Sequence, residues 1–263
     1  MNWVVVRSGR VSLARLLRPA LAAAIAACLV AAAPAGAITN GTADGTGHPN
    51  VGALVADQVY PDGTWTYCSG TLISPTVFLT AAHCEEGARV RVTFDPAYQD
   101  GDKTYTGTWH ADPAYNKSQS DPHDIAVVVF DKPIKGLTPA KLPTAGSLSN
   151  LSGSQQFTSV GYGAYEVTNG PGGHQYLYND VRGVATGTLN SINASWLRIS
   201  MNPSHGDGGT CYGDSGGPNF LGTTNIVAAT TITGDSVCRS TNVDYRLDTA
   251  SARNFLAPYV ALP

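Results

Sequence analysis

The pattern of apolar and polar positions along the chain predicts short β-strands in preference to helices. Eight short runs are rich in Val, Ile, Thr and Phe, and Gly, Pro, Asn and Asp separate them at fairly regular intervals. The runs are residues 51–59, 71–80, 90–94, 125–130, 156–161, 181–186, 196–201 and 226–233. Short strands at such spacing are typical of a barrel or a sandwich, so we expect an all-β fold.

The first 37 residues have a different pattern. A basic region is followed by an apolar, alanine-rich stretch over residues 19–33, and Ala35-Gly36-Ala37 fits the small-residue rule for signal-peptidase cleavage. The basic residues are Arg7, Arg10, Arg15 and Arg18. We therefore expect residues 1–37 to be a secretory signal peptide, residues 38–263 to be the mature domain, and the protein to be extracellular.

A second processing signal competes with this interpretation. Residues 25–28 end at Cys28 and loosely match a bacterial lipoprotein site, at which the cysteine would carry a lipid. The apolar stretch continues past this cysteine through residues 29–31, which favours the ordinary signal peptide.

Removal of the signal changes the charge of the chain. Four of the 16 lysine and arginine residues lie in the first 37 positions and none of the 19 acidic residues does, so the formal charge falls from −3 to about −7. No run of five basic residues remains in the mature part. We expect neither nucleic acid nor a membrane as a partner.

The mature part is long enough for one large β domain or for two small barrels that share a cleft. Residues 133–143 contain Pro and Lys and are a candidate linker between two barrels, and residues 164–174 form a Gly-rich surface loop. One helix is expected, from residue 250 to about residue 256, capped by Thr249 or Asp248. Its Phe255 and Leu256 would dock on the second barrel.

Candidate chemistry is concentrated in the block Cys211-Tyr212-Gly213-Asp214-Ser215-Gly216-Gly217-Pro218. A serine hydroxyl needs an activating base to act as a nucleophile, and small neighbours let a substrate carbonyl approach the amides of Gly213 and Ser215. The segment Leu79-Thr80-Ala81-Ala82-His83-Cys84 supplies a base, and Asp124 supplies a carboxylate before an apolar run. These residues predict a His83, Asp124, Ser215 triad.

The order of the three residues discriminates between folds. An α/β-hydrolase needs its histidine after the serine, but all six histidines precede Ser215: His48, His83, His110, His123, His174 and His205. The subtilisin order needs an aspartate first, which Asp44, Asp57 or Asp62 would satisfy. Nothing around these aspartates indicates a buried parallel strand, and helices are scarce. The order His, Asp, Ser is that of chymotrypsin.

With these motifs the chain resembles the secreted serine peptidases of the chymotrypsin/trypsin family. The matching segments are Ile38-Thr39-Asn40-Gly41, Cys68-Ser69-Gly70-Thr71-Leu72-Ile73, Thr80-Ala81-Ala82-His83-Cys84, Asp124-Ile125-Ala126, Gly161-Tyr162-Gly163 and the block around Ser215. The resemblance implies two six-stranded antiparallel β-barrels packed around a catalytic cleft, with a short C-terminal helix. The alanine-rich signal and the ending Tyr245-Arg246-Leu247-Asp248-Thr249 resemble bacterial members.

The resemblance also implies a role for each residue. His83 would act as general base and then general acid, Asp124 would orient its imidazole, and Ser215 would form the acyl-enzyme. The amides of Gly213 and Ser215 would form the oxyanion hole. The alternative for Asp124 is a surface-turn aspartate, and the adjacent His123 is a competing histidine.

In this family, the aspartate before the nucleophile pairs with a freed N-terminal amino group, and that pairing shapes the oxyanion hole. The resemblance assigns these roles to Asp214 and Ile38. Because the expected cleavage site ends at Ala37, signal peptidase alone would create this terminus, and the enzyme would be active once exported. The alternative for Asp214 is a solvated turn residue.

Four of the five cysteines lie in the mature part, and an even count in an exported chain implies disulfides with three possible connectivities. Proximity in the sequence and the family pattern favour Cys68 with Cys84 and Cys211 with Cys238. A zinc site is the alternative, although no Cys-x-x-Cys pair is present.

The substrate pocket departs from the trypsin pattern. The residues before Cys211 are Gly209 and Thr210, so the pocket base carries no carboxylate unless Asp207 shifts into it. Burial of an unpaired basic side chain is costly, and we expect cleavage after small or medium uncharged residues. The remaining pocket residues would be Tyr212 at the rim, Thr233 and Gly234 in a wall, and Val243.

We expect protein or peptide substrates, protein inhibitors, a monomer, no cofactor and no metal. Calcium is an alternative because acidic residues cluster at Asp100-Gly101-Asp102 and at Glu85-Glu86. Two other functions stay open, namely a catalytically silent family member that binds proteins, and an esterase that uses the same triad.

Overall fold

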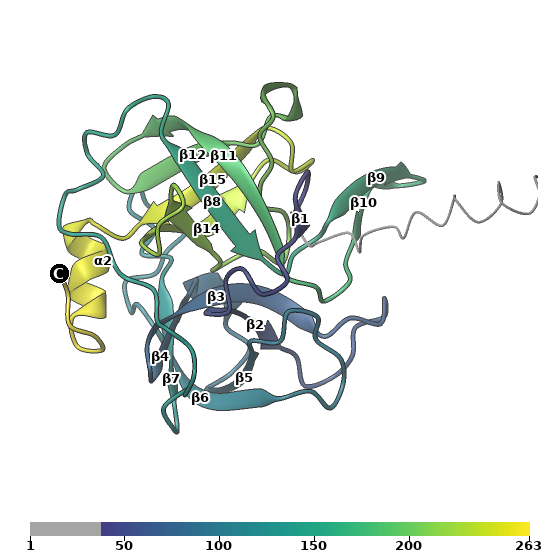
Figure 1. Cartoon of the computed structure of the whole chain (residues 1–263), viewed down its shortest axis with the longest axis horizontal. Helices are drawn as coiled ribbons and strands as arrows, with labels where there is room; N and C mark the ends of the chain where they lie inside the picture. Colours follow the sequence, from purple (N-terminus) through teal and green to yellow (C-terminus); the bar gives the residue numbers. More distant parts are fainter. Residues whose placement is uncertain (1–37) are drawn as a thin grey trace, which may run out of the picture. The chain divides into compact units, whose positions relative to one another are not determined.

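The computed structural model describes residues 38–263, which form two closed antiparallel β-barrels (Figure 1). The first barrel has six strands in the order β2-β3-β4-β7-β6-β5, and β5 pairs with β2 to close it. Its strands are β2 (Val51–Val55), β3 (Thr66–Ser74), β4 (Val77–Thr80), β5 (Arg89–Thr93), β6 (Thr104–Ala111) and β7 (Ala126–Phe130). The expected signal peptide and Cys28 lie outside the described residues.

The second barrel also has six strands, in the order β8-β11-β12-β15-β14-β13, and β13 pairs back with β8. Its strands are β8 (Gln156–Gly161), β11 (Gly183–Ile192), β12 (Trp196–Ser200), β13 (Pro218–Leu221), β14 (Val227–Gly234) and β15 (Thr241–Arg246). The short strand β1 (Thr42–Ala43) pairs with β11, so the start of the described chain belongs to this barrel. The connection between the barrels spans residues 131–155 and includes the expected linker.

The two barrels share one hydrophobic core. A single cluster of buried side chains contains Phe78 and Val128 from the first barrel and Phe220 and Val227 from the second. Burial of apolar surface is the main favourable contribution to packing, so this shared cluster fixes the barrels relative to each other. The cleft between the barrels therefore has a defined geometry.

The expected all-β class with two six-stranded barrels is confirmed, but several strands differ from the expected runs. The run over residues 71–80 is two strands, β3 and β4, which a turn after Ser74 separates. Residues 164–174 were expected to be a loop, and most of them belong to a hairpin of β9 (Glu166–Gly170) and β10 (Gly173–Leu177). Gly172, with φ +99°, permits the tight turn between these two strands.

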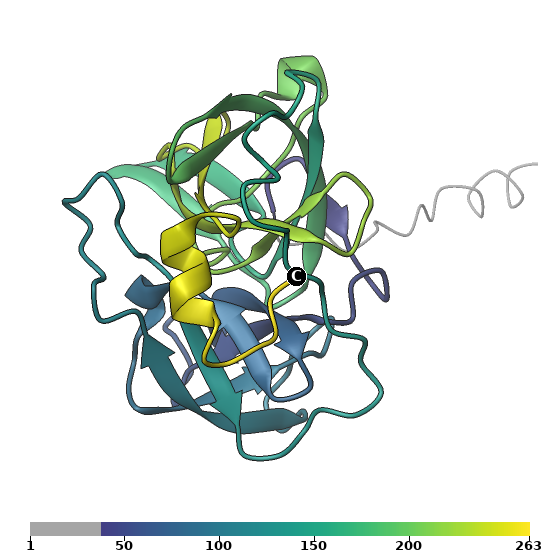
Figure 2. The ribbon, with the colours of Figure 1, turned by 90° about the vertical axis from the view of Figure 1, so that its left-hand side faces the viewer.

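The predicted C-terminal helix is present as α2 (Ala250–Leu256). Thr249 is its N-cap, because its Oγ1 accepts the N–H of Ala252 at 3.3 Å. Leu256 is fully buried in the cluster that both barrels share, and Tyr259 contacts the ring of His110 on β6. The helix therefore lies at the junction of the barrels and not on the second barrel alone (Figure 2).

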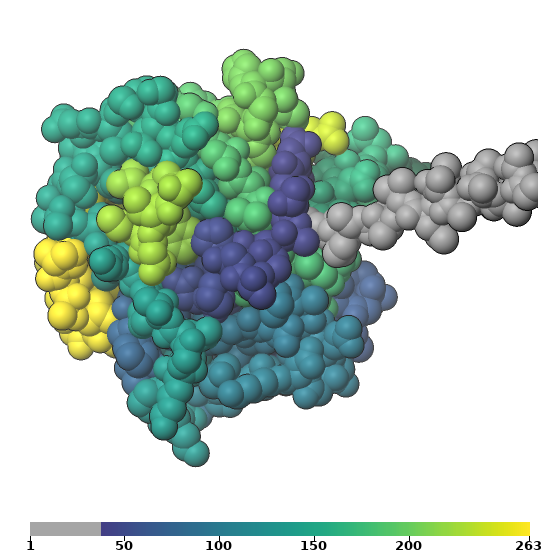
Figure 3. Space-filling model, viewed as in Figure 1, coloured from purple at the N-terminus to yellow at the C-terminus, as the bar shows by residue number. Residues whose placement is uncertain are grey.

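The junction of the barrels also holds a buried arginine, Arg182, with 1 % of its surface exposed. Its guanidinium pairs with Asp44 at 2.8 Å and donates to the carbonyl of Val51 in the first barrel and to Tyr162 Oη after β8. The N-terminal segment that contains Asp44 runs along the junction (Figure 3).

No helix in residues 38–263 is long and apolar enough to cross a bilayer.

Candidate active site

The cleft contains a cavity of about 680 Å³, and His83, Asp124 and Ser215 all line it. His83 lies in the 3₁₀ turn η2 (Ala82–Cys84), which directly follows β4. Asp124 lies just before β7, and Ser215 lies in the segment that leads into β13. The first barrel thus supplies the histidine and the aspartate, and the second barrel supplies the serine.

His83 and Asp124 make a two-point contact. The Nδ1 atom of His83 lies 2.8 Å from Asp124 Oδ2, and the backbone N–H of His83 donates to Oδ1 at 3.0 Å. Only 5 % of the Asp124 surface is exposed, so these bonds satisfy a carboxylate that would otherwise be costly to bury. A proton on Nδ1 directed at Asp124 leaves Nε2 free to accept another proton.

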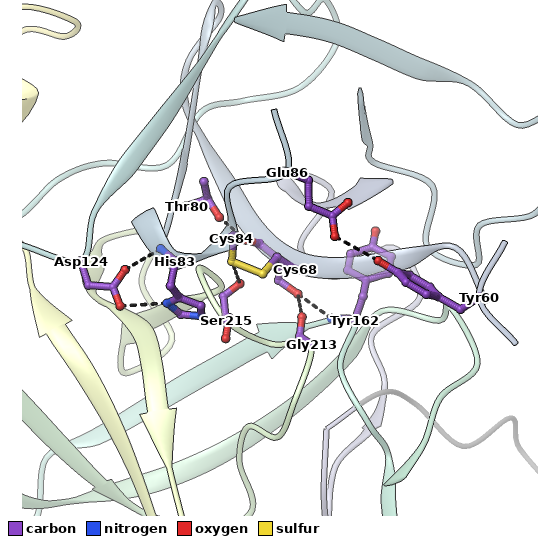
Figure 4. Close-up of a disulfide and its surroundings, with 11 residues drawn as sticks. Tyr60, Cys68, Thr80, His83, Cys84, Glu86, Asp124, Tyr162, Gly213 and Ser215 are labelled. Atoms are coloured by element: carbon purple, nitrogen blue, oxygen red, sulfur yellow. Dashed lines mark hydrogen bonds and ion pairs between the residues drawn. A yellow bond between two sulfur atoms is a disulfide. The ribbon is translucent and has the colours of Figure 1, made fainter. Parts of the chain in front are cut away.

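Ser215 lies on the side of the His83 ring that faces away from Asp124 (Figure 4). Within residues 38–263 its Oγ atom makes no hydrogen bond, so the hydroxyl is free at the cavity. Hydrogen bonds between a catalytic base and its nucleophile are often long before substrate binds. The order Asp124, His83, Ser215 therefore allows a proton to pass from the serine to the imidazole.

His123, the competing histidine, has a different partner. Its Nδ1 atom lies 3.0 Å from Asp112 Oδ2, and its backbone is left-handed with φ +52°. His123 is absent from the cavity lining, whereas its neighbour Asp124 belongs to it. Because the backbone of His123 is left-handed, the side chains of His123 and Asp124 point to different partners, and each belongs to a separate histidine–aspartate pair.

The loop before Ser215 presents two free amides. Gly213 has φ +93°, and a Cβ atom there would lie 2.8 Å from Gly163 Cα, so no other residue fits without strain. The carbonyl of Tyr212 accepts the N–H of Ala164 at 2.8 Å, which turns the N–H of Gly213 the opposite way. Neither the Gly213 nor the Ser215 amide donates to another group of residues 38–263.

Asp214 is completely buried beneath this loop. Its carboxylate accepts the N–H of Gly163 and the N–H of Cys211, both at 2.8 Å. Burial raises the pKa of Asp214 to about 7, and the two amide hydrogen bonds only partly oppose that rise.

The expected pair of Ile38 with Asp214 is not formed in the described chain, whose Ile38 nitrogen is a peptide nitrogen because Ala37 precedes it. Ile38 is 1 % exposed, and its N–H donates to the carbonyl of Ala164 at 3.4 Å. Because Ala164 follows Gly163, whose amide bonds the Asp214 carboxylate, both members of the expected pair contact the same dipeptide.

The two expected disulfides are present, and both border the cavity. Cys68 on β3 is bonded to Cys84 beside His83, and Cys211 is bonded to Cys238. The three side chains that resemble a metal-ligand set in the described residues are Cys68, His83 and Cys84. Their two sulfurs are bonded to each other, so they are not thiolate ligands.

Four of the six residues expected in the substrate pocket line the cavity: Thr210, Tyr212, Thr233 and Gly234. Gly209 does not, because its backbone pairs with Thr39 and a Cβ atom there would meet the side chain of Met201. Val243 does not line the cavity either; it lies on β15 between Thr233 on β14 and Arg198 on β12. The carboxylate of Asp207 is held away by Thr188, whose Oγ1 donates to it at 3.0 Å.

The cavity has lining residues that the sequence motifs did not identify: Tyr67, Lys117, Pro122, Tyr178, Trp196, Thr231 and Asp235. A second cavity of about 360 Å³ shares Tyr67, Tyr178 and Gly213 with the first. Lys117, Pro122 and Tyr178 lie outside the strands and Trp196 begins β12, and no motif marks these four positions. The other three are close to motifs in the sequence: Tyr67 directly precedes Cys68, and Thr231 and Asp235 are neighbours of Thr233-Gly234.

Comparison with known proteins shows which family this chain is similar to. The trypsin family model matches residues 48–255. A trypsin from Phaedon cochleariae is 30% identical over 59% of this chain and 64% of its own length, and glucanase inhibitor protein 2 from Phytophthora sojae is 29% identical over 58% and 54%. The chain thus matches less than two thirds of the length of these relatives.

A solved structure, HL collagenase, has the same fold at 18% sequence identity, with a TM-score of 0.60 over 79% of this chain and 92% of that chain. The family model covers most of the chain, including all three residues of the expected triad. This chain belongs to the trypsin family.

Proposed function

We propose that this protein is a secreted serine endopeptidase that hydrolyses peptide bonds through an acyl-enzyme on Ser215. The observation that carries the proposal is the two-point contact of His83 with Asp124, beside a free Ser215 hydroxyl in one cavity. A histidine that is oriented by a buried carboxylate next to a serine is the arrangement that nucleophilic catalysis by serine requires.

In the proposed reaction, Ser215 Oγ attacks the substrate carbonyl while its proton passes to His83 Nε2. The negative charge on the carbonyl oxygen is stabilised by the free amides of Gly213 and Ser215. His83 then gives the proton to the leaving amine, and the peptide C–N bond breaks. Water hydrolyses the acyl-enzyme by the same steps, again with His83 as base. The chain supplies both nucleophile and base, so the proposal includes no cofactor.

We propose a preference for small or medium uncharged side chains before the cleaved bond. Support comes from the lining residues Thr210, Thr233 and Gly234, which carry no charge, and from the engagement of Asp207 with Thr188. A lysine or arginine side chain would be desolvated in this pocket, and the carboxylate of Asp235, which also lines the cavity, already accepts the backbone N–H groups of Ser240 and Thr241.

The proposal includes secretion after removal of residues 1–37, protein inhibitors as further partners, and a monomeric state. The two disulfides support an oxidising compartment. The resemblance of the alanine-rich start and of residues 245–249 to bacterial members is part of the proposal and draws no support from the insect and oomycete relatives.

Labelling of the purified protein with a fluorophosphonate, followed by intact-mass measurement, tests this function. We expect one adduct on the wild-type chain and none on Ser215→Ala. The same spectrum shows whether the chain begins at Ile38. A wild-type chain that begins at Ile38 and takes no adduct would contradict the proposal.

A second candidate is a protein-binding role without catalysis, which the relatives named glucanase inhibitor favour. Such a protein would take no adduct and would form a stable complex with another enzyme. An esterase is separated by matched substrates: an amide and an ester of the same acyl group should both be cleaved by a peptidase, whereas an esterase cleaves the ester alone.

A further inference from the structure

Ser69 is a completely buried serine on β3, at the point where the first barrel contacts the nucleophile loop. Its backbone N–H donates to the carbonyl of Ser215 at 2.8 Å. Its side-chain Oγ donates to the carbonyl of Gly213 at 3.0 Å. One residue of the first barrel therefore holds both residues whose amides are the proposed oxyanion donors.

The direction of the Ser69 hydroxyl is fixed by a third contact. The backbone N–H of Tyr162, which follows β8, donates to Ser69 Oγ at 2.9 Å. A serine hydroxyl has one proton to donate. Because Tyr162 fills an acceptor position on Oγ, that proton is directed to the carbonyl of Gly213. Figure 4 shows Tyr162, Gly213 and Ser215 beside the strand that carries Cys68.

The remaining carbonyls of this loop are held by other groups. The N–H of Ala164 donates to the carbonyl of Tyr212, and the N–H of Gly217 donates to the carbonyl of Asp214, each at 2.8 Å. All four carbonyls of residues 212–215 are thus occupied, two of them by Ser69. Gly213 most needs such a restraint, because glycine populates many backbone conformations and loses the most freedom when fixed.

We propose that Ser69 is a positioning residue of the oxyanion hole, a role that rests on the proposed peptidase function. It fixes the peptide plane between Gly213 and Asp214, which lies between the plane that carries the Gly213 N–H and the plane that carries the Ser215 N–H, and so keeps both amides directed at the site of the developing negative charge. Without the hydroxyl, the Gly213 carbonyl and the Tyr162 N–H are both left buried and unpaired, which is costly. Rotation about the Gly213 backbone is the easiest relief, since no side chain resists it, and that rotation changes the direction of the Gly213 N–H relative to the Ser215 N–H.

Ser69→Ala and Ser69→Gly test this role, with the rate of fluorophosphonate labelling as the readout. Both variants remove the hydroxyl, and the glycine variant avoids any new contact in the packed strand. We expect labelling to slow roughly 10-fold, less than the ~10²–10³-fold loss expected when a donor is removed outright. The pH midpoint of the labelling rate, which reports His83, should not move.

Ser159→Ala is the matched control. Ser159 is also completely buried, and its Oγ donates to Asn219 Oδ1 at 2.6 Å inside the second barrel, away from the cavity lining. It should lose stability without slower labelling. Equal slowing in Ser159→Ala and Ser69→Ala would overturn the positioning role, as would labelling of both Ser69 variants within twofold of the wild type. An unreactive wild-type chain would instead overturn the peptidase proposal and this role with it.

Discussion

Two aspartates in the first barrel make the same contact with a histidine, but only one of these contacts borders the cavity. Asp124 Oδ2 lies 2.8 Å from Nδ1 of His83, and Asp112 Oδ2 lies 3.0 Å from Nδ1 of His123. Both carboxylates are buried, and both also accept a backbone N–H. The same substitution can therefore be compared at Asp124, the proposed catalytic position, and at Asp112, which lies outside the cavity lining.

We predict that Asp124→Asn lowers kcat on a peptide substrate by about 10⁴-fold, the loss expected when the histidine is held in the wrong tautomer. The amide NH₂ of asparagine cannot accept the Nδ1 proton, so Nε2 carries the proton and no longer accepts one from Ser215. Asp112→Asn should leave kcat unchanged. Comparable losses in the two variants would mean that the effect is structural.

The three residues of the proposed triad could be identified from the sequence because each lies in a short motif and the order of the motifs favours the fold that brings them together. Ser69 was inside one of these motifs and was still not identified. Its function depends on three contacts with residues 93 to 146 positions away along the chain, and no local pattern encodes them. No local pattern shows the role of Gly209 either: a Cβ atom there would meet the side chain of Met201, so the glycine is required by packing and does not line the cavity.

Between elements, Arg182 joins three segments at the junction of the barrels. It contacts Asp44 after β1, the carbonyl of Val51 at the start of β2, and the carbonyl of Phe94 after β5. Although burial raises the pKa of Asp44, hydrogen bonds from His48 and from Arg182 hold it below its ordinary value. The contribution of Asp44 to stability is therefore present above pH 3.8 and is lost as the pH falls below that value.

We predict that Arg182→Met destabilises the protein by about 3–5 kcal/mol, the usual effect when one partner of a buried ion pair is removed. Urea unfolding in a Ser215→Ala background, which prevents self-cleavage, measures it. Arg89→Met is the control: Arg89 pairs with Asp131 on the surface, where both side chains are about half exposed, and solvent screens the pair. A similar shift of the unfolding midpoint in both variants would contradict the prediction.

At the scale of elements, most strands whose inward positions are apolar were predicted from the sequence. The strands β6 and β13 were not predicted, and neither was β15. Its buried positions include Asn242 and Asp244, which face Asn219 and Thr231 inside the second barrel. Burial strongly raises the pKa of Asp244, although hydrogen bonds from neighbouring side chains oppose this. An inward row of polar side chains that hydrogen-bond to one another looks like a loop in a hydrophobicity pattern, because only the closed barrel brings the partners together.

For the molecule as a whole, the start of the described chain lies close to Asp214, because Ile38 contacts Ala164 and Asp214 contacts the adjacent Gly163. With residue 37 attached, Asp214 has only backbone amides as partners, and its pKa is raised from 3.8 to about 7 by burial. Cleavage before Ile38 would convert its nitrogen to an ammonium group next to Ala164, adjacent to the amide of Gly163 that bonds Asp214. A positive charge there favours the ionised carboxylate and lowers the pKa of Asp214.

The two forms should therefore differ in how stability depends on pH. In the uncleaved form, the native state holds a proton on Asp214 that the unfolded state has already released, so the associated stability is full below pH 3.8 and is lost as the pH rises to about 7. In a chain that begins at Ile38, this loss should be much smaller. Urea unfolding between pH 4 and 8, with Ser215→Ala in both forms, measures the difference. Asp214→Asn should abolish this difference between the two forms, because the asparagine does not titrate. Parallel pH profiles for the two forms with Asp214 intact would show that the new terminus does not reach the carboxylate.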